Sequence, residues 1–251
     1  MVARQVLATN PQVLADLDTA RLGTAFFRRA LNRVPNDAFD SPSVLPGWER
    51  RHVVAHVGYN ARAIARLVSW AATGVETSMY RSPGARAEEI EAGASLRPEA
   101  LRSLGEHAAI DLDVRWRDLP DAAWTAAVVT ASGRTVPVSE TLWMRSREVW
   151  LHAVDLDVGR HVSEIPRPVL SRLLTDVGGS WQKSGALGGL AISTDDSSGE
   201  PFRLGEESDA DTVVTGPLPT MVSWATGRLS DLEGSSLVWL KGEPRQAPRW
   251  L

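Results

Sequence analysis

One stretch of the chain carries ionisable side chains at a spacing suited to metal binding. Within residues 138–159, Arg145, Glu148, His152 and Asp155 follow one another at steps of three, four and three residues. Because an α-helix has about 3.6 residues per turn, these four side chains would lie on a single helix face. Glu148 and His152 would then be one turn apart, which is how a helix offers an oxygen and a nitrogen ligand to the same metal ion.

The same face has a simpler interpretation, a set of solvent-exposed ion pairs that each contribute only about 0.3–0.5 kcal/mol. The surrounding sequence favours a buried helix instead, with Ser139 as its N-cap and Gly159 as its stop. Its apolar positions, several of them aromatic, are Leu142, Trp143, Val149, Trp150, Val154 and Leu156. This apolar environment makes a metal site a stronger hypothesis than an isolated Glu-x-x-x-His pattern would.

A second histidine-bearing helix is predicted over residues 48–73, with Gly74 as its stop. His52 and His56 are four residues apart on this helix and share a face, so either could reach a metal beside the later helix. Each histidine could equally be an interior or capping residue. Valines at 53, 54 and 57 flank His56, which suggests that it is more deeply packed, whereas His52 lies nearer the helix start.

Two imidazoles and one carboxylate form the ligand set of a catalytic zinc site, which leaves a fourth position open for water or substrate. His56, Glu148 and His152, drawn from the two helices, would meet this requirement. Asp155 and Arg145 are available to orient these ligands from the next shell of contacts. A structural zinc site commonly includes cysteine, and the chain contains no cysteine.

Composition narrows the class of protein. The chain has 251 residues, 43% hydrophobic and 23% charged, which is ordinary for a globular protein. Its net charge of −4 argues against a nucleic-acid partner. No apolar run approaches the roughly 20 residues that cross a bilayer, and the first residues lack a signal-peptide core, so we expect no membrane partner and a cytoplasmic location.

The predicted elements divide the chain into two domains, residues 1–160 and 161–251. Four long helices in the first domain suggest a helix bundle, in which facing side chains build metal sites; they span 13–32, 48–73, 98–116 and 138–159. A short helix at 85–92 and a hairpin at 123–129 and 135–138 around Gly133 complete this domain. The second domain mixes helices and short strands: helices at 168–184 and 216–228, strands at 190–193, 212–215 and 237–240. The fold class is therefore α+β.

Several motifs resemble the family of mycothiol-dependent maleylpyruvate isomerases, and the similarity runs nearly end to end. They are L-P-G-W-E-R-R-H-V-V-A-H-V-G-Y-N-A, T-G-V-E-T-S-M-Y-R-S-P-G-A-R-A-E-E-I, G-R-T-V-P-V-S-E-T-L-W-M-R-S-R-E-V-W-L-H-A-V-D-L and the closing A-P-R-W-L. The resemblance implies an N-terminal four-helix bundle of the DinB type and a C-terminal α+β domain. It implies zinc ligands at His56, Glu148 and His152, and so favours His56 over His52. It also implies an arginine important for activity at Arg228, in A-T-G-R.

The reaction implied by this resemblance is the cis-to-trans isomerisation of maleylpyruvate to fumarylpyruvate, a step in gentisate breakdown. A thiolate that adds to the conjugated double bond permits rotation, and elimination restores the bond in trans form. Since the chain has no cysteine, a small-molecule thiol, mycothiol, must bring the sulfur. Zinc would coordinate that sulfur and lower its pKa. Arg228 would pair with a substrate carboxylate and stabilise the enolate that forms on addition.

Two other functions are compatible with these residues. A mycothiol S-transferase would use the same metal and thiol but would release the conjugate of another electrophile, without regenerating free thiol. A non-enzymatic module would bind the metal or the thiol and would not turn over maleylpyruvate. In each case we expect the chain to be a monomer.

Overall fold

Two units make up the chain, Met1–Arg160 and His161–Leu251. The computed structural model describes residues 5–195, 201–230 and 234–250. The first unit is mainly helical and the second combines helices with a small sheet, which confirms the predicted α+β class with a helical N-terminal part. Within the described residues, every helix falls short of the combination of length and apolar character that crossing a membrane requires.

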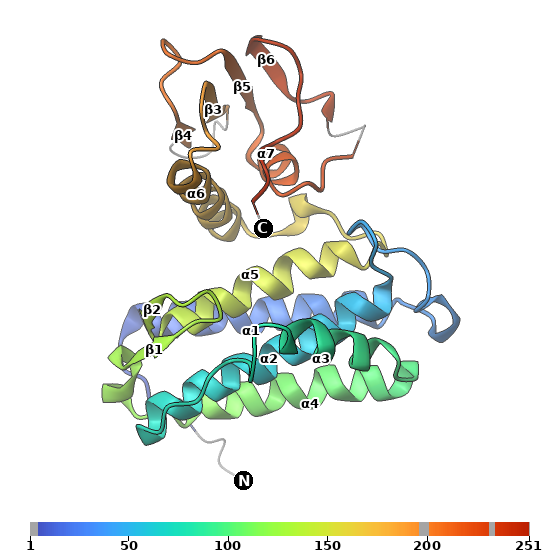
Figure 1. Ribbon diagram of the computed structural model, residues 1–251, viewed down its shortest axis with the longest axis vertical. Helices are drawn as coiled ribbons and strands as arrows, with labels where there is room; N and C mark the ends of the chain where they lie inside the picture. The colour runs from blue at the N-terminus through green and yellow to red at the C-terminus, as the bar shows by residue number, and fades with distance from the viewer. Residues whose placement is uncertain (1–4, 196–200, 231–233, 251) are drawn as a thin grey trace. The chain divides into compact units, whose positions relative to one another are not determined.

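The first unit is built around four long helices that pack in pairs (Figure 1). α2 packs on α4 and α1 packs on α5, while α2 also contacts α5 and the short helix α3. The helices are α1 (Pro11–Leu31), α2 (Arg50–Thr73), α3 (Ala85–Ala94), α4 (Pro98–Arg117) and α5 (Glu140–Asp155). Short 3-10 turns lie at Asn36–Ala38 and Asp121–Thr125. The predicted hairpin consists of β1 (Ala127–Val129) and β2 (Thr135–Pro137), which are antiparallel.

Local signals explain the ends of α2. A capping box begins it, in which the Glu49 side chain accepts the backbone N–H of His52 and the His52 ring accepts the N–H of Glu49. Gly74 ends it in the left-handed region, at φ 73°, and its N–H donates to the Trp70 carbonyl. The predicted stop is therefore confirmed, and its reason is the conformation that glycine adopts without a Cβ clash.

α5 begins directly after Ser139, the predicted N-cap, but ends short of Gly159, its predicted stop. Ser139 occupies the N-cap position, as predicted, but its backbone is already helical and its side chain makes no capping hydrogen bond. The first turn is instead held by Thr141, whose N–H donates to the Val138 carbonyl at 3.0 Å. The helix stops at Asp155, short of Gly159, because Asp157 already adopts a left-handed φ of 51°. The carbonyl of Asp155 then accepts the N–H of Val44 at 3.0 Å.

The α1–α5 contact depends on a small residue in α1. A Cβ at Gly23 would lie 2.7 Å from both Val149 and the indole nitrogen of Trp150, so glycine lets the two helices approach closely. The Trp150 ring packs on Phe26 at 5.0 Å and its indole N–H donates to the Thr19 carbonyl. The apolar positions predicted for α5 are all buried, as expected.

The second unit contains α6 (Arg167–Ser184), α7 (Leu218–Ala225), a 3-10 turn at Val162–Glu164 and a sheet of order β4-β3-β5-β6. β3 (Leu190–Thr194) runs parallel to β5 (Thr212–Gly216), whereas β4 (Arg203–Leu204) and β6 (Val238–Lys241) are antiparallel to their neighbours. β4 was not expected, because two paired residues are too short to produce an alternating pattern. Three indole rings, Trp181, Trp224 and Trp239, pack edge to face at 5.9 and 6.0 Å in this unit.

Candidate metal centre

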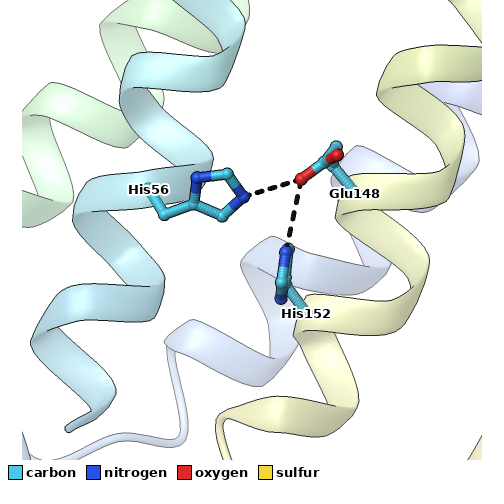
Figure 2. A group of neighbouring side chains, drawn as sticks. All are labelled: His56, Glu148 and His152. Atoms are coloured by element: carbon cyan, nitrogen blue, oxygen red, sulfur yellow. Dashed lines mark hydrogen bonds and ion pairs between the residues drawn. The ribbon is translucent and has the colours of Figure 1, made fainter. Parts of the chain in front are cut away.

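The structure brings His56 of α2 together with Glu148 and His152 of α5 (Figure 2). One carboxylate oxygen of Glu148 lies 2.7 Å from Nε2 of His56 and 3.3 Å from Nε2 of His152. Potential ligand atoms of all three residues lie within 4.8 Å of one another. The side chains are only 4%, 16% and 13% exposed, in the order His56, Glu148, His152. Two nitrogens and one oxygen therefore converge in a nearly buried space.

Electrostatics favour an ionised carboxylate between the imidazoles. Burial would raise the pKa of Glu148, but hydrogen bonds from His152 and His56, with their charges, hold it well below the ordinary value. Burial lowers the pKa of His56, so this ring is neutral at neutral pH and donates one N–H to the carboxylate. Glu148 is thus available as a charged oxygen ligand without losing a proton first.

Asp155 orients the second histidine. Its carboxylate accepts the Nδ1–H of His152 at 2.7 Å, and the residue is fully buried. Burial would lower the pKa of His152, but the hydrogen bonds to Asp155 and Glu148 outweigh this effect and raise it. With Nδ1 engaged by Asp155, Nε2 faces Glu148 and is the nitrogen that can bind either a proton or a metal ion.

Arg145 crosses from α5 to α2 one turn before Glu148. Its Nη1 donates to the Val57 carbonyl at 2.7 Å and to the Asn60 side-chain oxygen at 3.0 Å. Burial lowers the pKa of Arg145 to about 10, so it remains charged at neutral pH, and the nearby Glu148 charge favours that state. The arginine is 2% exposed, which makes it a buried cation in the seam between the two helices.

His52 lies one turn before His56 and has a different environment. Its Nδ1 accepts the Glu49 N–H at 3.2 Å, and its Nε2 lies 3.8 Å from the exposed Glu91 carboxylate. This side chain acts as the capping partner at the start of α2 and does not belong to the group of three potential ligands.

Arg228 belongs to the second unit and follows the end of α7. Gly227, at φ 73°, and Arg228 close this helix with two backbone hydrogen bonds, to Trp224 at 3.1 Å and Ser223 at 2.7 Å. This pair of bonds is a Schellman motif, in which the glycine takes the left-handed position. Nη1 of Arg228 also donates to the Thr226 carbonyl at 2.7 Å. The A-T-G-R motif is therefore a helix stop that fixes the backbone of its arginine.

Two further residues, not predicted from the sequence, lie near the candidate centre. The Trp48 ring packs edge to face on His56 at 5.6 Å and comes from the L-P-G-W loop before α2. Asn60 is the partner of Arg145 and lies four residues after His56. The helical spacing of Asn60 from His56 places both on one face of α2, but it does not reveal the pairing of Asn60 with Arg145.

Together, the fold and the centre define a class of protein: a helical bundle with a buried two-histidine, one-carboxylate group, followed by a small α+β unit. The model for the mycothiol maleylpyruvate isomerase N-terminal domain matches residues 20–157. The crystal structure of the mycothiol-dependent maleylpyruvate isomerase is 45% identical to the chain, with a TM-score of 0.88, covering 95% of this chain and 97% of that one. The chain belongs to the mycothiol-dependent maleylpyruvate isomerase family.

A further crystal structure, of a histidine-to-alanine mutant of the mycothiol-dependent maleylpyruvate isomerase, matches with the same identity, coverage and TM-score. No curated protein sequence matches the chain at a significant level.

Proposed function

We propose that the chain catalyses the mycothiol-dependent isomerisation of maleylpyruvate to fumarylpyruvate, with zinc held by His56, Glu148 and His152. The observation that carries this proposal is the convergence of these three side chains within 4.8 Å, in a chain that is 45% identical to an enzyme named for this reaction. The absence of cysteine agrees with it, because the reaction needs a thiolate that the chain does not contain.

The chemistry of the donor set fits zinc. Two histidine nitrogens and one carboxylate oxygen are a set found in catalytic zinc sites, and they leave one position open. The low pKa of Glu148 and the Asp155 hydrogen bond to His152 prepare a charged oxygen and a correctly oriented nitrogen. Zinc bound there would supply a Lewis acid that lowers the pKa of a coordinated thiol.

The side chains of this chain have distinct tasks in the proposed reaction. His56 and Glu148 would hold the metal from two helices, α2 and α5, and burial of both would limit competition from water. A proton on His152 Nε2 would have to leave before this nitrogen could bind the metal, and Asp155 would keep the other ring nitrogen protonated. The Trp48 ring provides an apolar wall beside His56, where low polarity strengthens the electrostatic interactions of the bound groups.

Arg228 is the proposed cation for the substrate. Addition of a thiolate to maleylpyruvate creates an enolate, and the substrate also carries carboxylates, so the reaction needs a fixed positive charge. A guanidinium can pair with a carboxylate through two parallel hydrogen bonds, which an ammonium does not do. The Schellman motif supports this role because it fixes the backbone from which the side chain projects.

The decisive experiment follows maleylpyruvate absorbance with zinc-loaded protein, with and without mycothiol. We expect turnover only when both zinc and mycothiol are present, and full recovery of free thiol at the end. Normal turnover by a stably folded, metal-stripped sample would refute the metal role. Progressive consumption of the thiol with substrate would identify an S-transferase instead, and tight zinc binding without turnover would identify a binding module.

A second experiment tests Arg228. In Arg228→Ala, zinc content should equal that of the unchanged protein while turnover falls about a hundredfold or more, the loss typical of a removed charged contact to a reacting group. Arg228→Lys should retain part of the turnover, because the charge remains but the two-pronged geometry is lost. Unchanged turnover in Arg228→Ala would remove this residue from the proposed site.

A further inference from the structure

The metal donors come from two separate helices, so their geometry depends on how α2 and α5 are aligned. His56 is supplied by α2, whereas Glu148 and His152 are supplied by α5. A helix that slides by one residue moves its side chains by about 1.5 Å, yet metal–ligand distances must be met within about 0.2 Å. A donor set of this kind therefore needs a contact that fixes the register between the two helices.

Among the polar contacts between α2 and α5 in the described part of the chain, two lie close to the donors. The first is the hydrogen bond between His56 and Glu148, at 2.7 Å, which binding of a metal would replace with coordination. The second is the pair of hydrogen bonds that Arg145 donates to the Val57 carbonyl and the Asn60 side chain. The Arg145 contact involves no metal donor, so it can remain unchanged whether or not the metal is bound.

The position of this contact is suited to alignment. On α5, Arg145 precedes Glu148 by three residues, and on α2, Asn60 follows His56 by four, so the contact lies one turn from the donors on both helices. Val57, whose carbonyl receives the shorter bond, is the residue next to His56. Arg145 reaches both acceptors through a single nitrogen, and a sliding motion of either helix would break one or both bonds.

We propose that Arg145 is a positioning residue, which holds α5 against α2 in the register that brings the three metal donors together. The burial of Arg145 argues for a role in geometry and against a role in stability. Transfer of a charged guanidinium to the interior is expensive, and a buried ionic group is often no more stabilising than an apolar side chain of similar volume. The guanidinium therefore matters for the alignment of α5 with α2 that it imposes, since methionine would fill a similar volume without making these hydrogen bonds. This inference rests on the proposed zinc site.

The test measures zinc affinity of the folded protein, by competition with a chromogenic chelator, for Arg145→Met and Arg145→Lys. We expect the dissociation constant to rise about 10–100-fold in Arg145→Met, the usual range for lost contacts behind metal ligands, and less in Arg145→Lys. Cobalt bound in place of zinc should show a changed visible spectrum in Arg145→Met, because ligand geometry changes. Neither measurement depends on turnover.

Arg102→Met is the matched control. Arg102 also links two helical segments through carbonyls, donating to Leu31 at 2.8 Å and to Val34, and it stacks on Phe39. It lies on α4, which carries none of the three donors, and its contacts do not link α2 to α5, so its loss should lower the urea midpoint and leave zinc affinity and the cobalt spectrum unchanged. Equal zinc affinity in Arg145→Met and the unchanged protein would overturn the proposal and leave Arg145 a merely structural residue.

Asn60→Ala keeps the proposal testable if Arg145→Met fails to fold. It should weaken zinc binding in the same direction, and combination with Arg145→Lys should add less than the sum of the two effects, because both changes act on one contact. Full additivity or no effect of Asn60→Ala would contradict the proposal. If the unchanged protein failed to bind zinc through His56, Glu148 and His152, the proposed function itself would be refuted. The same zinc titration therefore separates that failure from failure of the Arg145 proposal.

Discussion

The two sides of α5 differ in the kind of side chain that they bury. The side facing α1 is apolar and closely packed, with Val149 and Trp150 against Gly23 and Phe26. The side facing α2 buries ionisable groups, including Arg145, which is 2% exposed. Apolar burial stabilises the fold by about 25 cal/mol per Å², whereas burial of charges stabilises it little or not at all. The side that faces α1 therefore stabilises the bundle. The side that faces α2 contributes little stability, and its buried ionisable groups are held in place by the apolar packing elsewhere.

The largest expected effect concerns the metal-binding side. In His56→Ala, zinc should be lost and isomerisation should fall at least about a thousandfold, which is roughly 4 kcal/mol of activation free energy, because one of three ligands is missing. Circular dichroism should show a retained helical fold. The measurements are zinc content by atomic absorption and turnover with mycothiol.

His52→Ala is the control for this change, one turn earlier on the same helix. Loss of the capping box should reduce stability by about 1 kcal/mol and leave zinc bound, since His52 contacts Glu49 and Glu91. If zinc disappeared in His52→Ala and stayed in His56→Ala, the assignment of the two histidines would be reversed.

Trp150→Ala tests the opposite side of α5. Removal of this buried ring should reduce the free energy of unfolding by about 3–5 kcal/mol, since a cavity opens against Phe26 and the hydrogen bond to Thr19 is lost. Zinc affinity of the fraction that remains folded should change little. Urea unfolding of metal-free protein measures the first quantity. A loss of zinc binding without a loss of stability would erase the distinction between the two sides.

Asp155→Asn tests how the metal-binding side is supported. The change removes the carboxylate that accepts the His152 Nδ1–H, so we expect zinc affinity to fall about 10–100-fold, or roughly 1.4–2.7 kcal/mol. Asp157→Asn is a matched control two residues later, since Asp157 is exposed and asparagine tolerates its left-handed backbone. Equal zinc affinities in the two variants would show that Asp155 does not support the ligand.

Periodicity alone was enough to predict the bundle and the shared face of α5. The long helices were expected within a few residues, because apolar spacing extends over many turns and Gly74 provides a clear stop. The C-terminal end of α5 was wrong because a tertiary contact overrides the local signal there: the Val44 N–H donates to the Asp155 carbonyl, before the helix reaches Gly159. Ser139 does occupy the N-cap, although its side chain makes no capping hydrogen bond. β4 was missed because two residues carry no pattern.

The candidate centre was only partly predictable. Spacing placed Glu148 and His152 on one face, but it left His52 and His56 equivalent, since both have the same helical phase. The family resemblance favoured His56, and the two histidines have different neighbours in the fold: Glu49 engages His52, whereas Glu148 engages His56. The pairing of Arg145 with Asn60 could not be predicted either, because the two residues lie 85 residues apart and helical spacing relates residues only within one helix.

The smallest expected effect is the pH dependence of zinc affinity. In the metal-free protein the pKa of His152 is raised above 6.5, so below that raised pKa a proton occupies the nitrogen that zinc must bind. Zinc affinity should therefore increase by up to about tenfold per pH unit as pH rises toward this pKa, and level off above it. His56 has a lowered pKa and should contribute only at pH values below 6.5.

The raised pKa of His152 makes the stability of the metal-free protein decrease with pH, whereas zinc affinity increases with pH. A raised pKa of His152 stabilises the fold below 6.5, and this contribution disappears as pH rises through the folded pKa. Zinc should restore stability in that same upper range, so unfolding curves with and without zinc should diverge as pH increases. In Asp155→Asn, where the carboxylate that raises the pKa is gone, the divergence should begin at a lower pH. An unchanged onset would mean that Asp155 does not control the proton for which zinc competes.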